Sequence, residues 1–388
     1  MKKIIIVNNN MKVGGVQKSL YNLLWSLEDD YEITLLLFRA IGEYMHCLPA
    51  NVKVVEADGL FRYLGLSQGE CKGLDKLKRG ILAALCRVFG RNRVMKLLLA
   101  SQKTLPEEYD CAVAFLHNGN AKNFYGGVQE FVLHRVKARK KVAFLHCDYR
   151  NCGANHPSNN QLIAGFDQIA ACSDGCRKAF LSVLPQWENK CTTVTNCHRF
   201  EEIQALASDH PIAYERSCAH VIMVSRLAHE KGVERALEAM VYVIGKGIPM
   251  ELHLVGGGPM ESFLRERVEE LNLAGLVHFY GEQSNPYRYM KHADLFLMSS
   301  YHEAAPMVIE EAASLGVPVL TVETTSSEEM VTQRGCGWVC ANEQAALNEK
   351  LAQVLADASM LQAARIHLQG MVMNNTMALE QFRKMIEG

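Results

Sequence analysis

The pattern that decides the fold stands at the start of the chain, where residues 3–15 read KIIIVNNNMKVGG. An apolar, largely β-branched run at 3–8 gives way to polar asparagines and then to Gly14-Gly15, and a helical pattern follows at 16–28. A short, continuously apolar run predicts a strand that is buried on both faces, as the strands of parallel sheets are. The stretch therefore predicts a strand, a glycine turn and a helix, the first unit of a doubly wound α/β domain.

Similar apolar runs recur along the chain in two series, with helical patterns between them. The first series continues at 32–38, 52–56, 111–116, 141–146, 168–172 and 191–195. After a polar stretch at 201–217, the second series occupies 219–225, 250–255, 276–280, 294–298, 317–322 and 336–340, and terminal helices are expected at 343–369 and 374–387. This alternation predicts α/β domains with parallel sheets. We expect one Rossmann-like domain at 1–205, a second at 206–370, and a terminal helix at 371–388 that packs back on the first domain.

Bulk composition agrees with a two-domain globular protein. The 388 residues are 49% hydrophobic and 21% charged, which excludes a disordered or low-complexity chain. The 13 cysteines are an odd number without zinc-ribbon spacing, so we expect reduced thiols in a cytoplasmic protein. The apolar run near the N-terminus is too short for a signal peptide, and no run approaches the roughly 20 residues of a membrane span. The composition therefore predicts a protein that does not cross a bilayer.

Charge is divided unevenly between the two halves of the sequence. Residues 1–200 carry 27 Lys and Arg against 17 Asp and Glu, whereas residues 201–388 carry 14 against 25. A basic half favours an anionic partner. Nucleic acid is not expected as that partner, because the basic segments lack interleaved aromatic residues and a recognition motif.

The strongest concentration of positive charge lies at 72–103, where nine Lys and Arg stand against Asp75 alone. Helical spacing gathers apolar side chains on one face: Leu74, Leu77, Ile81, Leu85 and Val88. Basic side chains lie opposite this face or continue the segment: Lys76, Arg79, Arg87, Arg93 and Lys96. The pattern is typical of a helix on an anionic membrane surface, which predicts peripheral attachment to the cytoplasmic face. The alternative is a domain helix whose apolar face covers the first sheet and whose basic face is solvated.

A second glycine turn, Gly256-Gly257-Gly258, follows the run at 250–255 and has the same place in its half as Gly14-Gly15. Backbone amides in such turns can approach an anion or a sugar closely, although the same turns also serve purely structural roles. Neither turn carries the Lys-Ser/Thr of a phosphate-binding loop or a full G-x-G-x-x-G. The pattern therefore argues against a nucleotide hydrolase and against a dinucleotide oxidoreductase.

Charged residues follow two of the strands expected in the second half. Arg226 and Lys231 come after its first strand, whereas Glu303 and Glu311 flank the start of a helix near Ala305-Pro306. Ligands of open α/β sheets bind at the carboxyl ends of strands, and an arginine fork with a lysine charge suits a diphosphate. Taken alone, the same residues also fit a surface cation pair, a helix cap and a solvated glutamate.

Together, the motifs Arg-x4-Lys-Gly, Gly-Gly-Gly-Pro and Glu-x7-Glu make a sequence that resembles the retaining family 4 glycosyltransferases of the GT-B fold, of the type that assembles bacterial surface polysaccharides. The resemblance covers nearly the whole chain. It implies two Rossmann-like domains facing a cleft. It also implies transfer of a hexosyl or N-acetylhexosaminyl group, with retention, from a nucleoside diphosphate sugar to a glycan or lipid-linked acceptor. A UDP-sugar is the favoured donor, and the lack of any Asp-x-Asp fits a site without metal or cofactor.

The resemblance also implies roles for individual residues on the donor side. Arg226 and Lys231 would contact the diphosphate. Glu303 would bind hydroxyls of the donor sugar, and Glu311 would bind the ribose. The rest of the donor site would comprise Gly14, Gly15, Gly256, Gly257, Gly258, Ala304, Ala305, Pro306, Met307 and Val308.

Other residues would lie on the acceptor side, in the N-terminal domain. His146 corresponds to a histidine near the transferred sugar and would complete the catalytic set with Glu303, Arg226 and Lys231. His117 is the alternative, and a histidine at the end of a strand can also be purely structural. Ser173 and Asn196 would line the acceptor cleft.

Three positions depart from the family pattern. Ala304-Ala305 follows Glu303 where relatives carry Gly and an aromatic residue, and residues 324–329 read TTSSEE in place of Gly-Gly before a further glutamate. Asn196-Cys197-His198 replaces a common Asn-Gly or Asn-Pro turn. The departures bear on the identity of the donor sugar. They also support an alternative function, an inert sugar-nucleotide-binding module that recruits or regulates partner transferases at the membrane.

Overall fold

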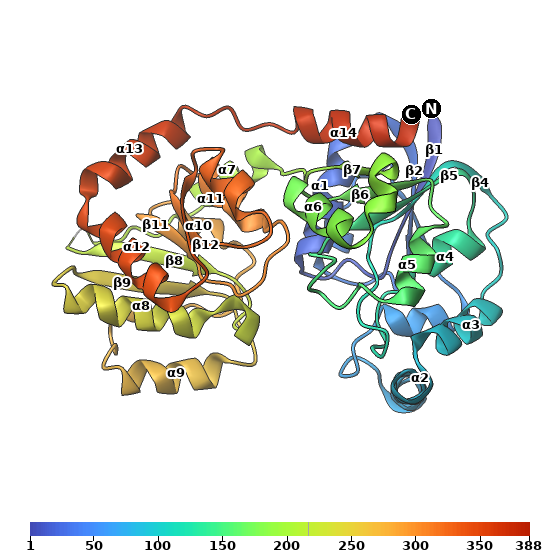
Figure 1. Cartoon of the computed structure of the whole chain (residues 1–388), viewed down its shortest axis with the longest axis horizontal. Helices are drawn as coiled ribbons and strands as arrows, with labels where there is room; N and C mark the ends of the chain where they lie inside the picture. Colours follow the sequence, from blue (N-terminus) through green and yellow to red (C-terminus); the bar gives the residue numbers. More distant parts are fainter. Residues whose placement is uncertain (216) are drawn as a thin grey trace. The chain divides into compact units, whose positions relative to one another are not determined.

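The structure is a computed structural model that describes residues 1–388 except residue 216, and it divides into two compact units. Unit 1 comprises Met1–Cys197 and Asn375–Gly388, and unit 2 comprises His198–Asn374. Each unit is built on one parallel sheet with helices against it (Figure 1). Unit 1 ends ahead of the expected boundary at 205, because the stretch expected as a linker begins with a helix that packs within unit 2.

The sheet of unit 1 has seven parallel strands in the order β3-β2-β1-β4-β5-β6-β7. The strands are β1 (Lys2–Asn8), β2 (Tyr31–Leu37), β3 (Lys53–Glu56), β4 (Glu108–Ala114), β5 (Lys137–Leu145), β6 (Gln168–Ala171) and β7 (Cys191–Thr193). The helices are α1 (Gly15–Ser26), η1 (Glu43–Cys47), η2 (Gly59–Leu64), α2 (Gly73–Phe89), α3 (Arg91–Ser101), α4 (Val128–Arg135), α5 (Pro157–Ile163), α6 (Asp174–Val183), η3 (Pro185–Lys190) and α14 (Thr376–Glu387).

The C-terminal helix α14 is part of unit 1. Its Phe382 is fully buried in the same apolar cluster as Ile4 of β1 and Leu24 of α1. From the middle of the helix, Gln381 accepts a hydrogen bond from the Thr195 backbone N–H at 2.9 Å, and Arg383 pairs with Asp30 at 2.7 Å. Burial of the Phe382 ring stabilises the packing of α14 on unit 1 by about 2–3 kcal/mol.

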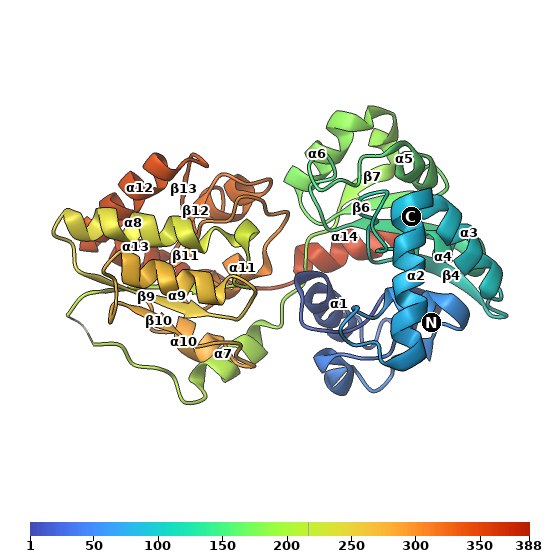
Figure 2. The ribbon, with the colours of Figure 1, turned by 90° about the horizontal axis from the view of Figure 1, so that it is seen from below.

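Helices α2 and α3 form the outer layer of unit 1 on the face of the sheet opposite to α14. Helix α4 packs on the sheet, α3 packs on α4 and η2, and α2 packs on α3, so α2 lies furthest from the sheet (Figure 1). In the view from below, α2 lies in front of the other elements of unit 1 (Figure 2). Gly90, with φ of +80°, ends α2 after Phe89 and begins α3. Among the described residues, no helix combines the length and the apolar character that a membrane crossing requires.

The sheet of unit 2 has six parallel strands in the order β10-β9-β8-β11-β12-β13. The strands are β8 (Ala219–Val224), β9 (Met250–Val255), β10 (Val277–Phe279), β11 (Leu295–Met298), β12 (Val319–Val322) and β13 (Gly337–Cys340). The helices are α7 (Phe200–Ser208), η4 (His229–Lys231), α8 (Val233–Gly245), α9 (Glu261–Glu270), α10 (Tyr287–Met290), α11 (Met307–Ser314), η5 (Glu328–Thr332), α12 (Gln344–Ala356) and α13 (Ala358–Gln369). One face of the sheet packs on α8, α9 and α12, and the other on α10, α11 and η5.

The predicted doubly wound α/β fold is confirmed in both units. Each of the thirteen apolar runs overlaps a strand, and each sheet reverses its strand order beside its first strand, between β1 and β4 and between β8 and β11. The single helix expected at 343–369 is wrong: α12 ends at Ala356, and the Asp357 carboxylate caps a new helix by accepting from the Ser359 N–H at 3.0 Å.

Candidate functional site

The candidate donor site lies in unit 2 at the point where the strand order reverses. Strands β8 and β11 are neighbours, and the loops that leave their carboxyl ends carry the charged residues singled out in the sequence. In open α/β sheets this switch point is where ligands bind, because the loops on its two sides diverge and leave a crevice. The loop after β9 carries Gly256-Gly257-Gly258 to the same edge.

The glycine turn and the loop after β8 are in backbone contact. Gly256 has φ of +135°, and a Cβ there would stand 1.9 Å from the Ser225 carbonyl oxygen. A Cβ on Gly258 would stand 2.3 Å from the Leu227 carbonyl oxygen, and the Leu227 N–H donates to the Gly257 carbonyl at 2.9 Å. The glycines are thus required for close packing of the two loops. Direct contact between these glycines and a donor stays a prediction.

Lys231 and Glu303 meet at the centre of this edge. Lys231 Nζ donates to Glu303 Oε1 at 2.6 Å, and the Ser300 hydroxyl donates to the same oxygen at 2.8 Å. Both charged side chains are largely buried, with 26% and 13% of their surface exposed. Gly232, at φ of +62°, allows this approach, because a Cβ there would lie 2.2 Å from the Ser299 carbonyl oxygen. The cation and the carboxylate that the sequence assigned to one donor are therefore in direct contact.

Arg226 lies on the exposed rim of the same loop. Its guanidinium forms an ion pair with Glu230, and both side chains are open to solvent. A backbone hydrogen bond, together with the Arg226 charge, lowers the pKa of Glu230 and keeps it ionised. The Glu230 carbonyl in turn accepts from the Tyr301 N–H at 2.9 Å, which ties the loop after β8 to the loop after β11.

Helix α11 carries two adjacent glutamates, Glu310 and Glu311, and both side chains are largely buried. Glu311 is only 3% exposed, so its interpretation as a solvated helix residue is wrong. Burial raises the pKa of the neighbouring Glu310, while Arg334, its ion-pair partner, opposes the rise.

Four residues of the expected donor segment are partly exposed around the start of α11, namely Ala304, Ala305, Pro306 and Val308, whereas Met307 is buried.

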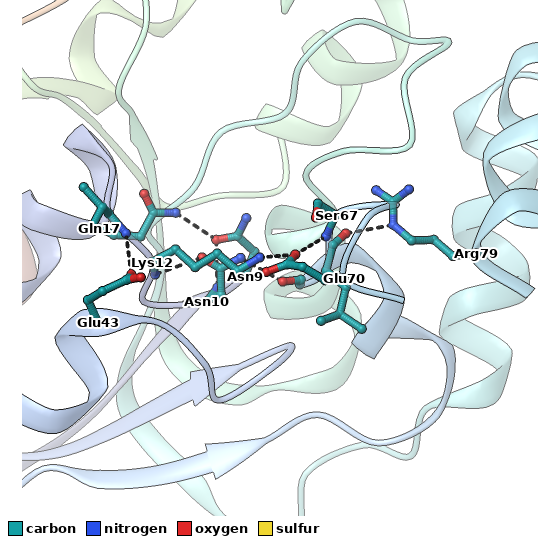
Figure 3. A network of polar contacts seen from close by, with 11 residues as sticks. Asn9, Asn10, Lys12, Gln17, Glu43, Ser67, Glu70 and Arg79 are labelled. Carbon is teal, nitrogen blue, oxygen red and sulfur yellow. Dashed lines mark hydrogen bonds and ion pairs between the residues drawn. The ribbon is translucent and has the colours of Figure 1, made fainter. Parts of the chain in front are cut away.

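The Gly14-Gly15 turn of unit 1 is supported by a polar network that the sequence did not reveal (Figure 3). Lys12, just before the turn, forms an ion pair with Glu70, and the Val13 N–H donates to Glu43 at 3.1 Å. Gln17 of α1 donates to Asn9 at 3.1 Å. Gly15 itself has open space where a Cβ would stand. The contacts join residues far apart in sequence, so no local pattern could have predicted them.

The same network extends from this turn to α2. The Glu70 carboxylate also accepts from the Ser67 N–H at 2.6 Å, and next to Ser67 the Leu66 carbonyl accepts from Arg79 Nε at 2.8 Å (Figure 3). Arg79 Nη1 donates to Gln68 at 2.9 Å. Arg79 was expected on the membrane surface, but its guanidinium is bound within unit 1.

The two strand-end histidines lie beside each other at the carboxyl ends of β4 and β5. The His146 ring packs on Phe115 and Phe144, with ring centres 4.6 and 5.3 Å away. His146 Nε2 and His117 Nδ1 are buried without a hydrogen-bond partner. Burial lowers the pKa of His146 to about 3 and that of His117 to about 4. Both rings are therefore neutral at pH 7, and neither supplies a positive charge.

These two histidines predict that the protein loses stability in acid. Their pKa values are lower in the folded state than the ordinary value of about 6.5, so the unfolded chain binds protons first as the pH falls. We expect the free energy of unfolding to fall from pH 6.5 towards pH 4, by roughly 1.4 kcal/mol per pH unit for each histidine. Urea unfolding at pH 7 and 5 measures this. His146→Gln should show a shallower pH dependence, and equal slopes for parent and variant would contradict the interpretation.

Ser173 and Asn196 both have structural partners. The Ser173 hydroxyl is buried and caps α6 by accepting from the Cys176 N–H at 3.0 Å. Asn196 Oδ1 accepts from the Ser19 hydroxyl of α1 at 2.7 Å. Their expected place at an acceptor cleft stays a prediction.

The apolar face of α2 is exposed instead of covering the sheet. Leu74 is 73% exposed, Leu77 60% and Val88 72%, whereas the helix buries its other side through Leu82 and Cys86. The alternative in which this face packs on the domain is therefore wrong. Four of the five expected surface cations are exposed, namely Lys76, Arg87, Arg93 and Lys96.

A protein-family model and several curated proteins match the part of the chain that holds this site. Residues 218–367 match the family model described as "Glycosyl transferases group 1". An uncharacterized glycosyltransferase of Methanocaldococcus jannaschii is 28% identical over 152 residues, 38% of this chain and 37% of that protein. The lipopolysaccharide glucosyltransferase WaaG of Escherichia coli is 31% identical over 135 residues, 34% of this chain and 36% of that protein. The chain thus spans less than two fifths of the length of these curated relatives.

Solved structures are similar over the whole chain. HepE of Anabaena, in complex with UDP, has a TM-score of 0.64 at 17% identity, covering 99% of this chain and 97% of that one. TarM of S. aureus, in complex with UDP and sugars, has a TM-score of 0.65 at 13% identity, covering 100% of both chains. Both units therefore have the GT-B type of Rossmann-like fold. Within unit 2, the match to the group 1 glycosyltransferase family model runs from residue 218 to residue 367.

Proposed function

We propose that this protein is a retaining glycosyltransferase that moves a hexosyl or N-acetylhexosaminyl group from a nucleoside diphosphate sugar to a glycan or lipid-linked acceptor in surface-polysaccharide assembly. The observation that carries the proposal is the contact between Lys231 and Glu303 at the switch point of a glycosyltransferase group 1 domain. The names of relatives support the setting, since WaaG is a lipopolysaccharide glucosyltransferase and WcaL of Escherichia coli is a putative colanic acid biosynthesis glycosyltransferase.

The charges suit the departure of a diphosphate. Breaking the anomeric bond leaves negative charge on the nucleotide, which Lys231 stabilises at short range and Arg226 from the rim. Glu303, an acceptor of hydrogen bonds, binds hydroxyls of the sugar on the other side of that bond. His146 is neutral, so any role of this residue in the reaction is that of a hydrogen-bonding group and not of a charge. None of these residue roles requires a metal or an organic cofactor, and UDP is the favoured nucleotide because HepE and TarM were solved with it.

Release of UDP from UDP-sugars by the purified chain tests the enzymatic proposal. Transfer or slow donor hydrolysis is expected in the presence of lipid-linked oligosaccharides. The alternative, an inert module that recruits partner transferases, is supported by Ala304-Ala305, which replaces Gly and an aromatic residue next to Glu303. Tight UDP binding without any UDP release would establish that alternative.

We further propose that the protein attaches peripherally to the cytoplasmic face of an anionic membrane through α2 and α3. Exposed apolar side chains, among them Leu74, Leu77 and Val88, lie beside exposed cations. They form a surface that is costly to leave in water and is suited to the headgroup region of a bilayer. Each Lys or Arg near an anionic leaflet contributes about 1 kcal/mol, or about fivefold in affinity. The remaining basic residues of unit 1 would add a longer-range attraction that salt weakens.

Replacement of Lys76, Arg87, Arg93 and Lys96 by Gln is expected to weaken binding to phosphatidylserine vesicles about fivefold for each cation removed. Vesicle sedimentation at two salt concentrations measures the loss. A control variant removes four exposed cations elsewhere: Lys2, Arg150, Lys178 and Lys246. The control variant should bind the vesicles nearly as tightly as the parent does. Equal losses of affinity in both variants would show that binding depends on total charge and not on the surface formed by α2 and α3.

A further inference from the structure

Three side chains of metal-ligand type gather in unit 1 outside the candidate donor site. One ring nitrogen of His117 and the sulfurs of Cys147 and Cys152 all lie within 4.8 Å of one another. Cys147 is buried and Cys152 is exposed, so the group has a protected side and a side open to solvent. No spacing motif marks these residues, since they come from the ends of two different strands.

The fold brings the three residues together for identifiable reasons. His117 follows β4 and Cys147 follows β5, and these strands are parallel neighbours with Ala114 opposite Ala143. A tight turn then returns the chain, because the Cys152 and Asn151 N–H groups both donate to the Asp148 carbonyl, at 2.9 and 3.0 Å. The turn places the Cys152 thiol in hydrogen-bonding contact with the Cys147 thiol.

One of these three side chains has a buried polar atom without a hydrogen-bond partner. His117 Nδ1 is buried and makes no hydrogen bond, a costly state for a polar atom in a folded protein. A second group of metal-ligand type among the described residues, Cys218 with His220 and Glu251, differs in this respect. There His220 Nδ1 lies 3.0 Å from a nitrogen of His253, and Glu251 Oε2 lies 2.8 Å from a nitrogen of His278. The second group is satisfied by its own hydrogen bonds, whereas the first is not.

We propose that His117, Cys147 and Cys152 bind one zinc ion. Imidazole nitrogen and thiolate sulfur are the ligands that zinc prefers, with bonds of about 2.0 and 2.3 Å. Ligands around a tetrahedral zinc are about 3.3–3.8 Å apart, so small side-chain rotations bring the three atoms to the ion. The exposed side near Cys152 leaves a fourth position for water. Zinc binding releases the thiol protons to solvent.

The ion would tie the turn after β5 to the end of β4, directly beside His146. It would act as a positioning element for the backbone that carries this histidine, and it takes no part in the departure of the nucleotide. The inference does not rest on the proposed transferase activity, because its ligands are outside the residues of unit 2 that support that activity. The expectation of a metal-free reaction concerns the donor site and is separate.

Zinc content of the intact, reduced chain after equilibration with zinc and dialysis is the first test. About one zinc per chain is expected in the parent, together with a thiolate-to-metal absorption band when cobalt replaces zinc. Cys147→Ser and Cys152→Ser should each weaken zinc binding on the order of 100-fold or more, since even indirect partners of a metal site are worth 10- to 100-fold. Zinc should raise the melting temperature of the parent but not of these variants.

Matched controls separate this site from the other thiols. Cys47→Ser removes an exposed cysteine, and Cys218→Ser breaks the second group, so both should retain the zinc and the cobalt band. In the parent itself, zinc should protect Cys147 and Cys152, but not Cys47, from alkylation followed by peptide mapping. Loss of zinc only in Cys218→Ser, or unprotected alkylation, would overturn the proposal. So would a Cys147–Cys152 disulfide that forms in a chain unable to take up zinc when reduced.

Discussion

Glu303→Gln is expected to lower kcat for sugar transfer about 100-fold while leaving the affinity for the free nucleotide nearly unchanged. Glutamine has almost the same volume, so the loop after β11 should keep its fold. The loss arises because hydrogen bonds between a carboxylate and sugar hydroxyls, worth about 1.5–3 kcal/mol each, strengthen as the anomeric bond breaks. Steady-state kinetics with a UDP-sugar, combined with UDP binding by calorimetry, separates the two quantities.

Glu323→Gln provides the matched control for this substitution. Glu323 is an exposed carboxylate just after β12, the strand next to β11. Lys231 and Ser300 donate their hydrogen bonds to Glu303 and not to Glu323. Its kcat should remain close to that of the parent. If Glu303→Gln weakened nucleotide binding and left kcat unchanged, Glu303 would contact the nucleotide instead of the sugar, and the assigned roles would be reversed.

Lys231→Ala is expected to raise KM for the donor, and Kd for the nucleoside diphosphate, about 10- to 150-fold. The substitution removes a charge-assisted hydrogen bond worth roughly 1.5–3 kcal/mol and leaves Glu303 without its cationic partner beside an incoming diphosphate. Arg226→Ala should fall at the lower end of the same range, because the Arg226 guanidinium is exposed and is shared with Glu230. Equal donor affinity in parent and both variants would show that the diphosphate binds elsewhere.

The sequence predicted the fold well because parallel strands are buried on both faces. Each strand then reads as a short apolar run, as at 3–8 and 219–225, and the polar turns between runs mark where strands stop. Helix boundaries were harder to predict. Asp357, a polar residue within an otherwise helical pattern, ends α12 and caps α13, and α7 lies in a stretch whose polarity indicated a linker.

Residues of the candidate site that follow the ends of strands could be predicted from the sequence. Contacts between residues far apart in the sequence could not. Lys231 and Glu303 both follow strands that the order of the sheet makes neighbours, so their contact agrees with the pattern. The ion pair between Lys12 and Glu70 joins residues 58 positions apart, and no periodicity encodes it. The exposure of the apolar face of α2 likewise depends on which side of the helix packs on α3, which the heptad-like spacing leaves open.

Titration of the intact chain with UDP, GDP and ADP in a calorimeter is the direct measurement of whether unit 2 holds a sugar nucleotide. One of the three, with UDP favoured, should bind at one molecule per chain, and Lys231→Ala and Glu311→Gln should each bind it more weakly, the former by about 10- to 150-fold. Absence of binding by all three nucleotides, or equal affinity in the parent and both variants, would contradict the donor site at the ends of β8 and β11.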